Sequence, residues 1–191
     1  MKKIPARIEA FDNSNLQGSN PVSALVCFVN GRPLKKEYRK FNIKTVVGAD
    51  DFKSMGEVIF RCYSRRIKEG KKLPDLILID GGKGQLSYAK KTLNKLGLEN
   101  IAIIGLAKRM EEVFLPGNSH PQNIKKTSPA LFLLRQIRDE VHRYAISFHR
   151  VKRSSASFNS ALRKISGLGN IRHQKLFNKY GNTDKMILDS P

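Results

Sequence analysis

Four residues of the 191-residue chain have side chains and positions suited to metal chemistry. Asp12 and Asp80 each follow a short apolar run, and Asp51 opens a segment in which apolar residues recur at helical spacing. His142 lies in a second, longer segment with the same spacing. Carboxylate oxygens favour Mg²⁺ or Mn²⁺ over zinc, and a neutral imidazole makes Mn²⁺ acceptable as well. A divalent ion held by such groups can polarise a phosphodiester and lower the pKa of an attacking water, so the set predicts phosphodiester hydrolysis.

Asp80 ends what the sequence predicts to be a central strand. The run 76–79 is wholly apolar, is too short for a helix, and is flanked by Pro74, Gly81 and Gly82. A polar residue at the carboxyl end of such a strand lies where open α/β sheets gather ligands and catalytic groups. The alternative is that Asp80 caps the next helix or starts a Gly-Gly turn.

The glycines after Asp80 do not form a nucleotide-binding loop of the Walker type. That pattern needs Gly-Lys followed by Ser or Thr to hold magnesium, whereas Lys83 is followed by Gly84. Nucleotide hydrolysis of that type is therefore not predicted, and Lys83 stays a candidate for phosphate contact.

The elements that must position the four residues follow from periodicity and turn residues. The predicted strands span 6–11, 22–29, 37–43, 76–80, 101–106 and 112–115, and the predicted helices span 51–68, 85–96 and a long segment from Pro129. If the strands that end at Asp12 and Asp80 are neighbours, the two carboxylates lie side by side. Two such charges at about 4 Å repel by roughly 4 kcal/mol at an effective dielectric of about 20, so the pair favours a bound cation.

The presence of Asp51 has an alternative explanation, because an acid at a helix start also caps the helix and interacts favourably with its dipole.

The charge balance points to a polyanionic partner. The chain has 36 Lys and Arg against 16 Asp and Glu, a formal net charge of +20, while 40% of its residues are hydrophobic. Nucleic acid is the first candidate, because each neutralised phosphate releases counterions on binding.

No stretch approaches the roughly 20 apolar residues of a membrane span and the N-terminus lacks a signal-peptide core, so we expect a cytoplasmic protein. Cys27 and Cys62 lack metal-binding spacing and are expected to be reduced core thiols.

Two further features predict contact with phosphate. The long helix from Pro129 carries a basic stripe that includes Arg138 and His149, which is either a solvated face or one wall of a phosphate-binding cleft. Near the end of the chain, Gly167 and Gly169 lie between two helical segments, as in a tight turn. Backbone N–H groups at such a turn can bind one phosphate without reading sequence, although an ordinary helical hairpin has the same pattern.

Seven segments of the chain together resemble one known family. They are FDNSNLQG (11–18), EYRKFNI (37–43), GADDF (48–52), LPDLILIDGGKGQL (73–86), GLAKR (105–109), SPALFLLRQIRDEVHRYAISFHR (128–150) and ISGLGNIR (165–172). This combination covers nearly the whole chain and is similar to UvrC, the nuclease subunit of bacterial nucleotide excision repair. The resemblance implies a ribonuclease-H-like nuclease domain that cuts on the 5′ side of a DNA lesion, followed by tandem helix-hairpin-helix motifs that hold DNA.

The resemblance also implies roles for individual residues. By motif position, the family's catalytic acids fall on Asp12, Asp51 and Asp80, and its histidine falls on His142. The chain has FDNSN where FDISH is commoner in the family, and this difference leaves Asp12 in place. The family's separate N-terminal nuclease domain, its helicase-binding segment and the second hairpin are expected to be absent, so the 3′ incision is not assigned to this chain.

These observations predict an α/β fold, a ribonuclease-H-like mixed sheet flanked by helices with a small helix-hairpin-helix appendage. The predicted units are an endonuclease domain at 1–150, a linker at 151–158 and an incomplete helix-hairpin-helix DNA-binding segment at 159–191.

The predicted function is a metal-dependent DNA endonuclease of nucleotide excision repair. Asp12, Asp80 and His142 are the predicted ligands of Mg²⁺ or Mn²⁺, although His142 is alternatively a proton carrier. Asp51 is a further predicted catalytic acid that would also hold the ion. The predicted partners are damaged double-stranded DNA and the helicase subunit that loads the nuclease at damage.

Two alternatives to this function remain. One is a non-catalytic nucleic-acid-binding module with structural acids, and the other is a different ribonuclease-H-like nuclease such as a junction resolvase, which the hairpin segment disfavours. The predicted DNA contacts are Lys83, Arg138, His149, Gly167 and Gly169.

Overall fold

The computed structural model describes residues 4–14, 22–46, 50–107 and 112–181. The chain divides into two compact units, Met1–Ala145 and Ile146–Pro191. The first unit contains the sheet and the helices that pack on it, and the second contains the end of the longest helix and a further helix. Among the described residues, no helix combines the length and the apolarity that crossing a membrane would require.

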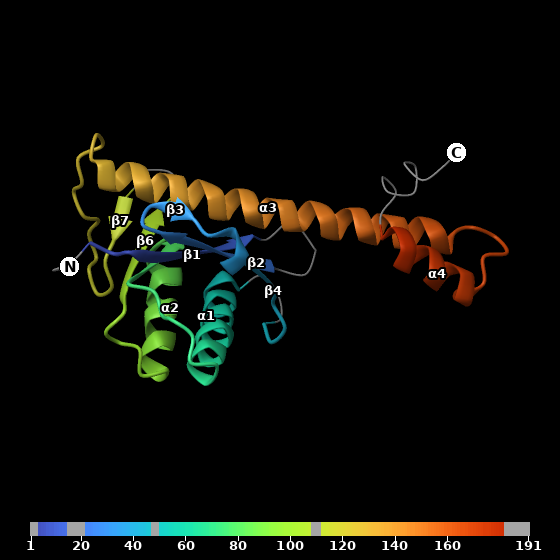
Figure 1. Ribbon diagram of the computed structural model, residues 1–191, viewed down its shortest axis with the longest axis horizontal. Helices are drawn as coiled ribbons and strands as arrows, with labels where there is room; N and C mark the ends of the chain where they lie inside the picture. The colour runs from blue at the N-terminus through green and yellow to red at the C-terminus, as the bar shows by residue number, and fades with distance from the viewer. Residues whose placement is uncertain (1–3, 15–21, 47–49, 108–111, 182–191) are drawn as a thin grey trace. The chain divides into compact units, whose positions relative to one another are not determined.

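The strands of the first unit that the structure describes form one seven-stranded mixed sheet (Figure 1). They are β1 (Arg7–Ser14), β2 (Val22–Val29), β3 (Arg32–Pro33), β4 (Arg39–Asn42), β5 (Leu76–Asp80), β6 (Ala102–Ala107) and β7 (Glu112–Phe114). The order is β3-β2-β1-β5-β6-β7, and β4 pairs with β2. The central strands β1, β5 and β6 run parallel to one another, whereas β2 is antiparallel to β1 and β7 is antiparallel to β6. The predicted mixed α/β sheet is confirmed.

Helices cover both faces of this sheet (Figure 1). The described helices are α1 (Asp51–Lys68), α2 (Lys83–Lys95), α3 (Pro129–Arg163) and α4 (Asn170–Tyr180), with a short 3-10 turn, η1 (Lys35–Glu37). α1 and α2 pack on one face, and the first part of α3 packs on the other. α1 has the predicted bounds, because its apolar residues recur at helical spacing and form the buried stripe.

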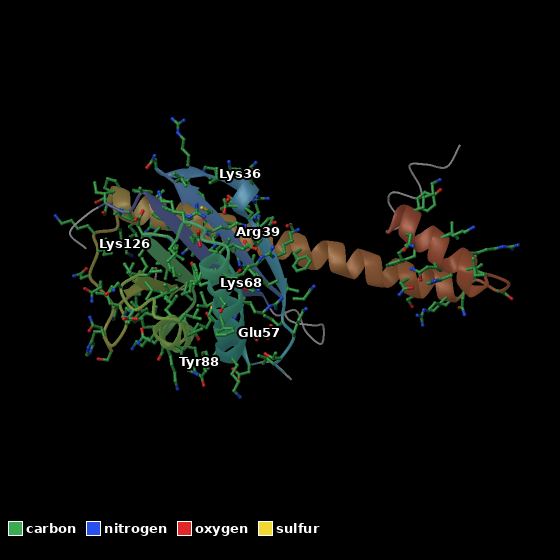
Figure 2. All side chains as sticks on the ribbon, turned by 60° about the horizontal axis from the view of Figure 1, so that its bottom comes forward. Lys36, Arg39, Glu57, Lys68, Tyr88 and Lys126 are labelled. Atoms are coloured by element: carbon green, nitrogen blue, oxygen red, sulfur yellow. The ribbon has the colours of Figure 1, made fainter. Side chains whose placement is uncertain are left out.

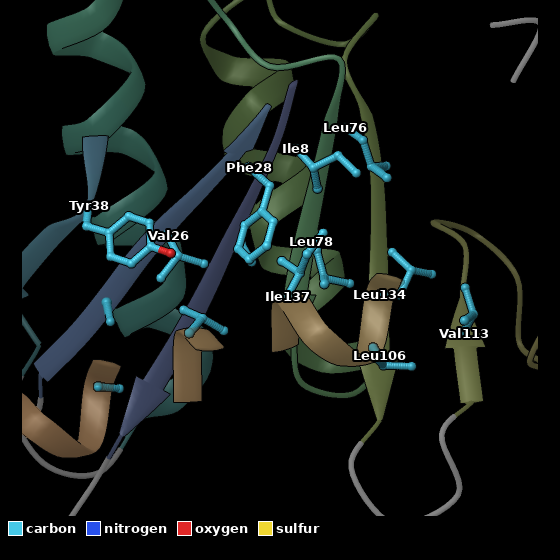
Figure 3. Close-up of a cluster of buried hydrophobic side chains, with 14 of the residues drawn as sticks. Ile8, Val26, Phe28, Tyr38, Leu76, Leu78, Leu106, Val113, Leu134 and Ile137 are labelled. Carbon is cyan, nitrogen blue, oxygen red and sulfur yellow. The ribbon is translucent and has the colours of Figure 1, made fainter. Parts of the chain in front are cut away.

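Each face of the sheet has its own apolar core. Figure 3 shows the core next to α3, in which Leu78 of β5 lies near Ile137 of the helix. Successive side chains of a strand point to opposite faces, so Leu76 and Leu78 join this core while Ile77 and Ile79 join the core under α1 and α2. Burial on both faces explains why the run 76–79 has no polar alternation, and the predicted central strand is confirmed.

The two cysteines belong to the interior, as predicted. Cys27 and Cys62 are free and buried, and desolvation raises the pKa of each thiol to about 11. Both thiols are therefore protonated at neutral pH, which fits a structural role.

A buried ionic network fixes β1 against α1. The carboxylate of Glu9 is fully buried and lies 2.7 Å from Arg7 Nη2 and 2.9 Å from Arg66 Nη1. The Tyr63 hydroxyl donates a hydrogen bond to the other carboxylate oxygen at 2.9 Å. Because a buried charge without partners is costly, these contacts favour one position of α1 along the strand.

The predicted strand at 37–43 is shorter in the structure. Within this predicted segment only Arg39–Asn42, which is β4, pairs with β2, because the residues 35–37 form η1. This turn places the Glu37 carboxylate 3.2 Å from Arg7 and 3.5 Å from Arg66. Burial acts to raise the pKa of Glu37, but the hydrogen bond and charge of Arg7 outweigh it, and the pKa is lowered.

The predicted linker at 151–158 is helical instead, because α3 continues without interruption to Arg163. The sequence between Pro129 and Gly167 contains no glycine or proline, and its serines and alanines allow a helix to propagate. The boundary between the two compact units falls within this helix, after Ala145.

The second unit contains the predicted helix, tight turn and helix. α3 ends at Arg163, and α4 begins directly after Gly169. Gly167 has φ of 78°, a left-handed conformation that glycine adopts without steric cost. Phe158 stacks on Phe177 with ring centroids 6.3 Å apart, so the two helices share an apolar contact.

Candidate metal centre

The pairing of β1 with β5 places two carboxylates side by side. Asp12 lies opposite Asp80 in this parallel pair, at the carboxyl ends of both strands. Each carboxylate side chain has only 6% of its surface exposed. The condition on which the sequence analysis placed the two acids side by side, that these strands are neighbours, is met. Two adjacent buried acids favour a compensating cation.

α3 brings His142 to the same pair. Its Nδ1 lies 2.9 Å from Asp12 Oδ2 and 3.8 Å from Asp80 Oδ2. Each of the three side chains offers one ligand atom, and these atoms all lie within 4.8 Å of one another. Two carboxylate oxygens and an imidazole nitrogen at this separation match the donor set of one divalent cation. The three residues predicted as metal ligands are therefore close enough to share an ion.

Asp51 lines the same pocket but is not one of the three grouped residues. It lies in the first turn of α1. The capping function belongs to its neighbour Asp50, whose Oδ1 accepts a hydrogen bond from the Lys53 N–H at 2.9 Å. Capping therefore accounts for Asp50 rather than for Asp51, and a catalytic function of Asp51 stays a prediction.

A pocket of about 890 Å³ opens above the three grouped residues. Its walls come from the ends of β1 and β5, from the first turns of α1 and α2, and from His142 of α3. Segments far apart in the sequence thus meet at the carboxyl edge of the parallel strands, where α/β sheets commonly bind ligands.

Asn13, Phe52 and Gln85 are among the pocket residues that were not predicted as site residues from the sequence. Asn13 Nδ2 donates to the carbonyl oxygen of Asp51 at 2.9 Å, which links the end of β1 to the start of α1. Phe52 and Gln85 line the pocket walls. Asn13 could have been predicted as a pocket residue because it directly follows Asp12 in the sequence. Phe52 could not, because the sequence does not distinguish an aromatic residue near a helix start from a core residue.

Two of the predicted DNA contacts lie outside this pocket. Lys83 is exposed at the start of α2, and its ammonium lies 5.2 Å from the centroid of the Phe114 ring. Arg138 forms an ion pair with the exposed Asp139 at 2.8 Å. A DNA contact at either residue stays a prediction.

The other predicted DNA contacts, His149, Gly167 and Gly169, belong to the second unit. His149 belongs to α3, but its side chain lies outside the described residues. Gly167 and Gly169 belong to the turn of the second unit. Their contact with phosphate stays a prediction.

Comparison with known proteins gives a consistent set of similarities. The family of the UvrC RNAse H endonuclease domain matches residues 1–146. UvrABC system protein C of Christiangramia forsetii is 57% identical over 168 residues, which are 87% of this chain and 28% of that protein. The protein of the same name from Prosthecochloris aestuarii is 48% identical over 186 residues, 97% of this chain and 30% of that protein. The chain thus spans less than a third of the length of these curated relatives.

Among solved structures, endonuclease V of Ciona intestinalis in complex with inosine-containing DNA aligns with a TM-score of 0.42. The sequence identity is 18%, over 56% of this chain and 48% of that chain.

Proposed function

The chain belongs to the family of the UvrC RNAse H endonuclease domain, and from this we propose that it hydrolyses a phosphodiester bond of DNA with a divalent metal ion. The observation that carries the proposal is the cluster of Asp12, Asp80 and His142, two buried carboxylates and an imidazole at the carboxyl edge of the sheet. The net charge of +20 agrees with a polyanionic substrate.

Mg²⁺ or Mn²⁺ bound at this cluster would polarise the phosphodiester and activate the attacking water. Asp12 and Asp80 would hold the ion through carboxylate oxygens, and His142 through a neutral imidazole nitrogen. Strand pairing fixes the two aspartates, and the packing of α3 on the sheet fixes His142. Asp51 lines the same pocket, and we propose that it is a further catalytic carboxylate there.

We further propose that the bond cut lies on the 5′ side of a lesion during nucleotide excision repair. This assignment is supported by family membership and by the relatives named UvrABC system protein C. The partners would be damaged double-stranded DNA and the helicase subunit that loads the nuclease, and the activity would be cytoplasmic.

A nicking assay with purified protein tests the hydrolysis. Supercoiled plasmid DNA carrying ultraviolet lesions should be converted to the nicked form in Mg²⁺ or Mn²⁺ and should stay intact when the metal is chelated. Binding of the plasmid without nicking in either metal would instead identify a non-catalytic nucleic-acid-binding module.

The lysines of α2 indicate where DNA leaves the pocket. α2 contains four lysines and no acidic residue, whereas α1 pairs its own basic residues with acids, for example Arg61 with Glu57 at 2.7 Å. Lys83, Lys90 and Lys91 line a groove of about 450 Å³ between α2 and the turn that follows β7. Because the first turn of α2 also lines the candidate metal pocket, the groove leads away from that pocket along the helix.

Replacing both Lys83 and Lys91 by Gln should weaken DNA binding and flatten its dependence on salt. Each lost phosphate contact lowers the slope of log K against log salt by about 0.9 for duplex DNA, so two contacts correspond to about 1.8. The matched control replaces Lys68 and Lys71 by Gln, near the end of α1 and about 25 Å along that helix from its start at the pocket. Anisotropy titrations at several salt concentrations measure both slopes, and an equal loss in the two double variants would mean that DNA does not follow the groove.

A further inference from the structure

Two aromatic rings, one of them in the wall of the candidate metal pocket, stack on each other. Phe52 lines the pocket and is 48% exposed, and Tyr88 of α2 is 40% exposed. Figure 2 places Tyr88 at the outer surface of the first unit. The ring centroids are 5.9 Å apart, and the ring planes differ by 22°. Single exposed apolar side chains are ordinary, but a stacked pair beside buried carboxylates calls for an explanation.

The ring of Phe52 is held in place by α2. It lies against Gly84, where an added Cβ would overlap the ring. The buried stripe of α1 is formed by other residues, so Phe52 is not part of the core under that helix. Phe52 therefore packs on α2 while nearly half of its surface stays open to solvent.

The same pocket contains two polar atoms that lack a hydrogen-bond partner among the described residues. Asn13 Oδ1 and Gln85 Oε1 are both buried acceptors. The bond from Asn13 Nδ2 to the Asp51 carbonyl fixes the orientation of that amide. The wall of the pocket beside the aromatic pair is therefore polar.

We propose that Phe52 and Tyr88 form a stacking platform for the base of a nucleotide next to the scissile phosphate, with Phe52 as the ring that touches the base. The inference rests on the proposed function, because it assumes that the reacting phosphate lies at Asp12 and Asp80. A phosphodiester joins two nucleosides, so a wall beside the reacting phosphate faces a sugar or a base. Aromatic side chains stack on bases of any identity because every base has a π face.

The platform has a consequence for the form of the substrate. A base can stack on a side chain only after it leaves the stack of the double helix, at an energetic cost that is lowest where the strand is already unpaired. The protein should therefore act on a strand that is single-stranded or distorted at the nucleotide beside the cut.

The chain has no tryptophan, which makes stacking directly measurable. Phe52→Trp introduces a sole indole, and its fluorescence should be strongly quenched when single-stranded DNA is added in Ca²⁺, which also takes carboxylate ligands. The matched control is Phe60→Trp, on the same helix two turns away and 50% exposed, whose emission should change little. Equal quenching of both indoles, or none in Phe52→Trp, would overturn the platform.

A second variant separates stacking from packing. Phe52→Leu keeps an apolar contact with α2 but removes the π face, so binding of a thymidine oligomer should weaken about tenfold. Binding of an oligomer of abasic nucleotides should be the same for Phe52→Leu and the wild type. A tenfold loss on the abasic oligomer as well would assign Phe52 to packing alone.

The two proposals fail in distinguishable ways. A wild-type protein that nicks no DNA in either metal, while Phe52→Trp is quenched by DNA, would refute the hydrolysis and leave only a base-binding site. Nicking by the wild type, with no quenching of Phe52→Trp, would refute the platform and leave the hydrolysis intact.

Discussion

Asp12→Asn and Asp80→Asn should each abolish nicking of DNA while leaving DNA affinity close to that of the wild type. Asparagine keeps the size of the side chain but removes the charge that holds a divalent cation. Loss of an outer-shell partner of a metal ligand commonly costs about 10–100-fold in affinity or activity, so loss of a direct ligand should exceed about a hundredfold. The nicking assay at saturating DNA measures this effect.

Asp139→Asn is the matched control for these two variants. Asp139 is also a carboxylate, lies on α3 one turn before His142, and has 68% of its side chain exposed. It should nick DNA at the wild-type rate. If Asp12→Asn or Asp80→Asn kept a rate near that of Asp139→Asn, the metal centre would not lie at these residues.

Glu9→Gln should produce the second large effect, a loss of stability of about 3 kcal/mol in the free energy of unfolding. The Glu9 carboxylate accepts from Tyr63 and balances the guanidinium groups of Arg7 and Arg66, all three of them buried. Glutamine has nearly the same volume as glutamate, but it has no negative charge. Its amide N–H group would also face the hydroxyl or guanidinium groups, which are themselves hydrogen-bond donors. Urea denaturation followed by circular dichroism measures the change.

The control for Glu9→Gln is Glu69→Gln, which removes an acid from an exposed ion pair with Arg65 at the end of α1. Surface ion pairs contribute little because water and salt screen them, so its denaturation midpoint should stay near that of the wild type. Equal midpoints for Glu9→Gln and Glu69→Gln would show that the buried network does not stabilise the fold.

The strands that carry Asp12 and Asp80 could be predicted from the sequence because the pattern that defines each strand is local, whereas the pairing of the two strands was only a condition of the prediction. An apolar run bounded by turn residues defines each strand, and parallel strands bring their carboxyl ends to one edge of the sheet. The helical spacing placed His142 on a long helix. Its hydrogen-bond partner Asp12, however, lies 130 residues earlier in the sequence. Spacing carries no information about contacts at that range, and for His142 the resemblance supplied what periodicity could not.

Other features depend on tertiary contacts that a one-dimensional pattern does not contain. The partners of Glu9 come from α1, and no periodicity links that strand residue to Arg66. The exposed position of Phe52 follows from its contact with Gly84, a residue of a different helix. The segment 151–158, which contains three serines, was predicted to be a linker, yet serines do not interrupt a helix when glycine and proline are absent.

The position of a bound Mn²⁺ ion tests the central claim most directly. Crystals of the protein soaked in Mn²⁺ should give an anomalous diffraction peak within coordination distance, about 2.1 Å, of carboxylate oxygens of Asp12 and Asp80 and near an imidazole nitrogen of His142. The same soak of Asp80→Asn crystals should give no peak there. A Mn²⁺ peak elsewhere in the wild-type protein, or none in crystals of a protein that nicks DNA, would contradict the assignment of these three residues.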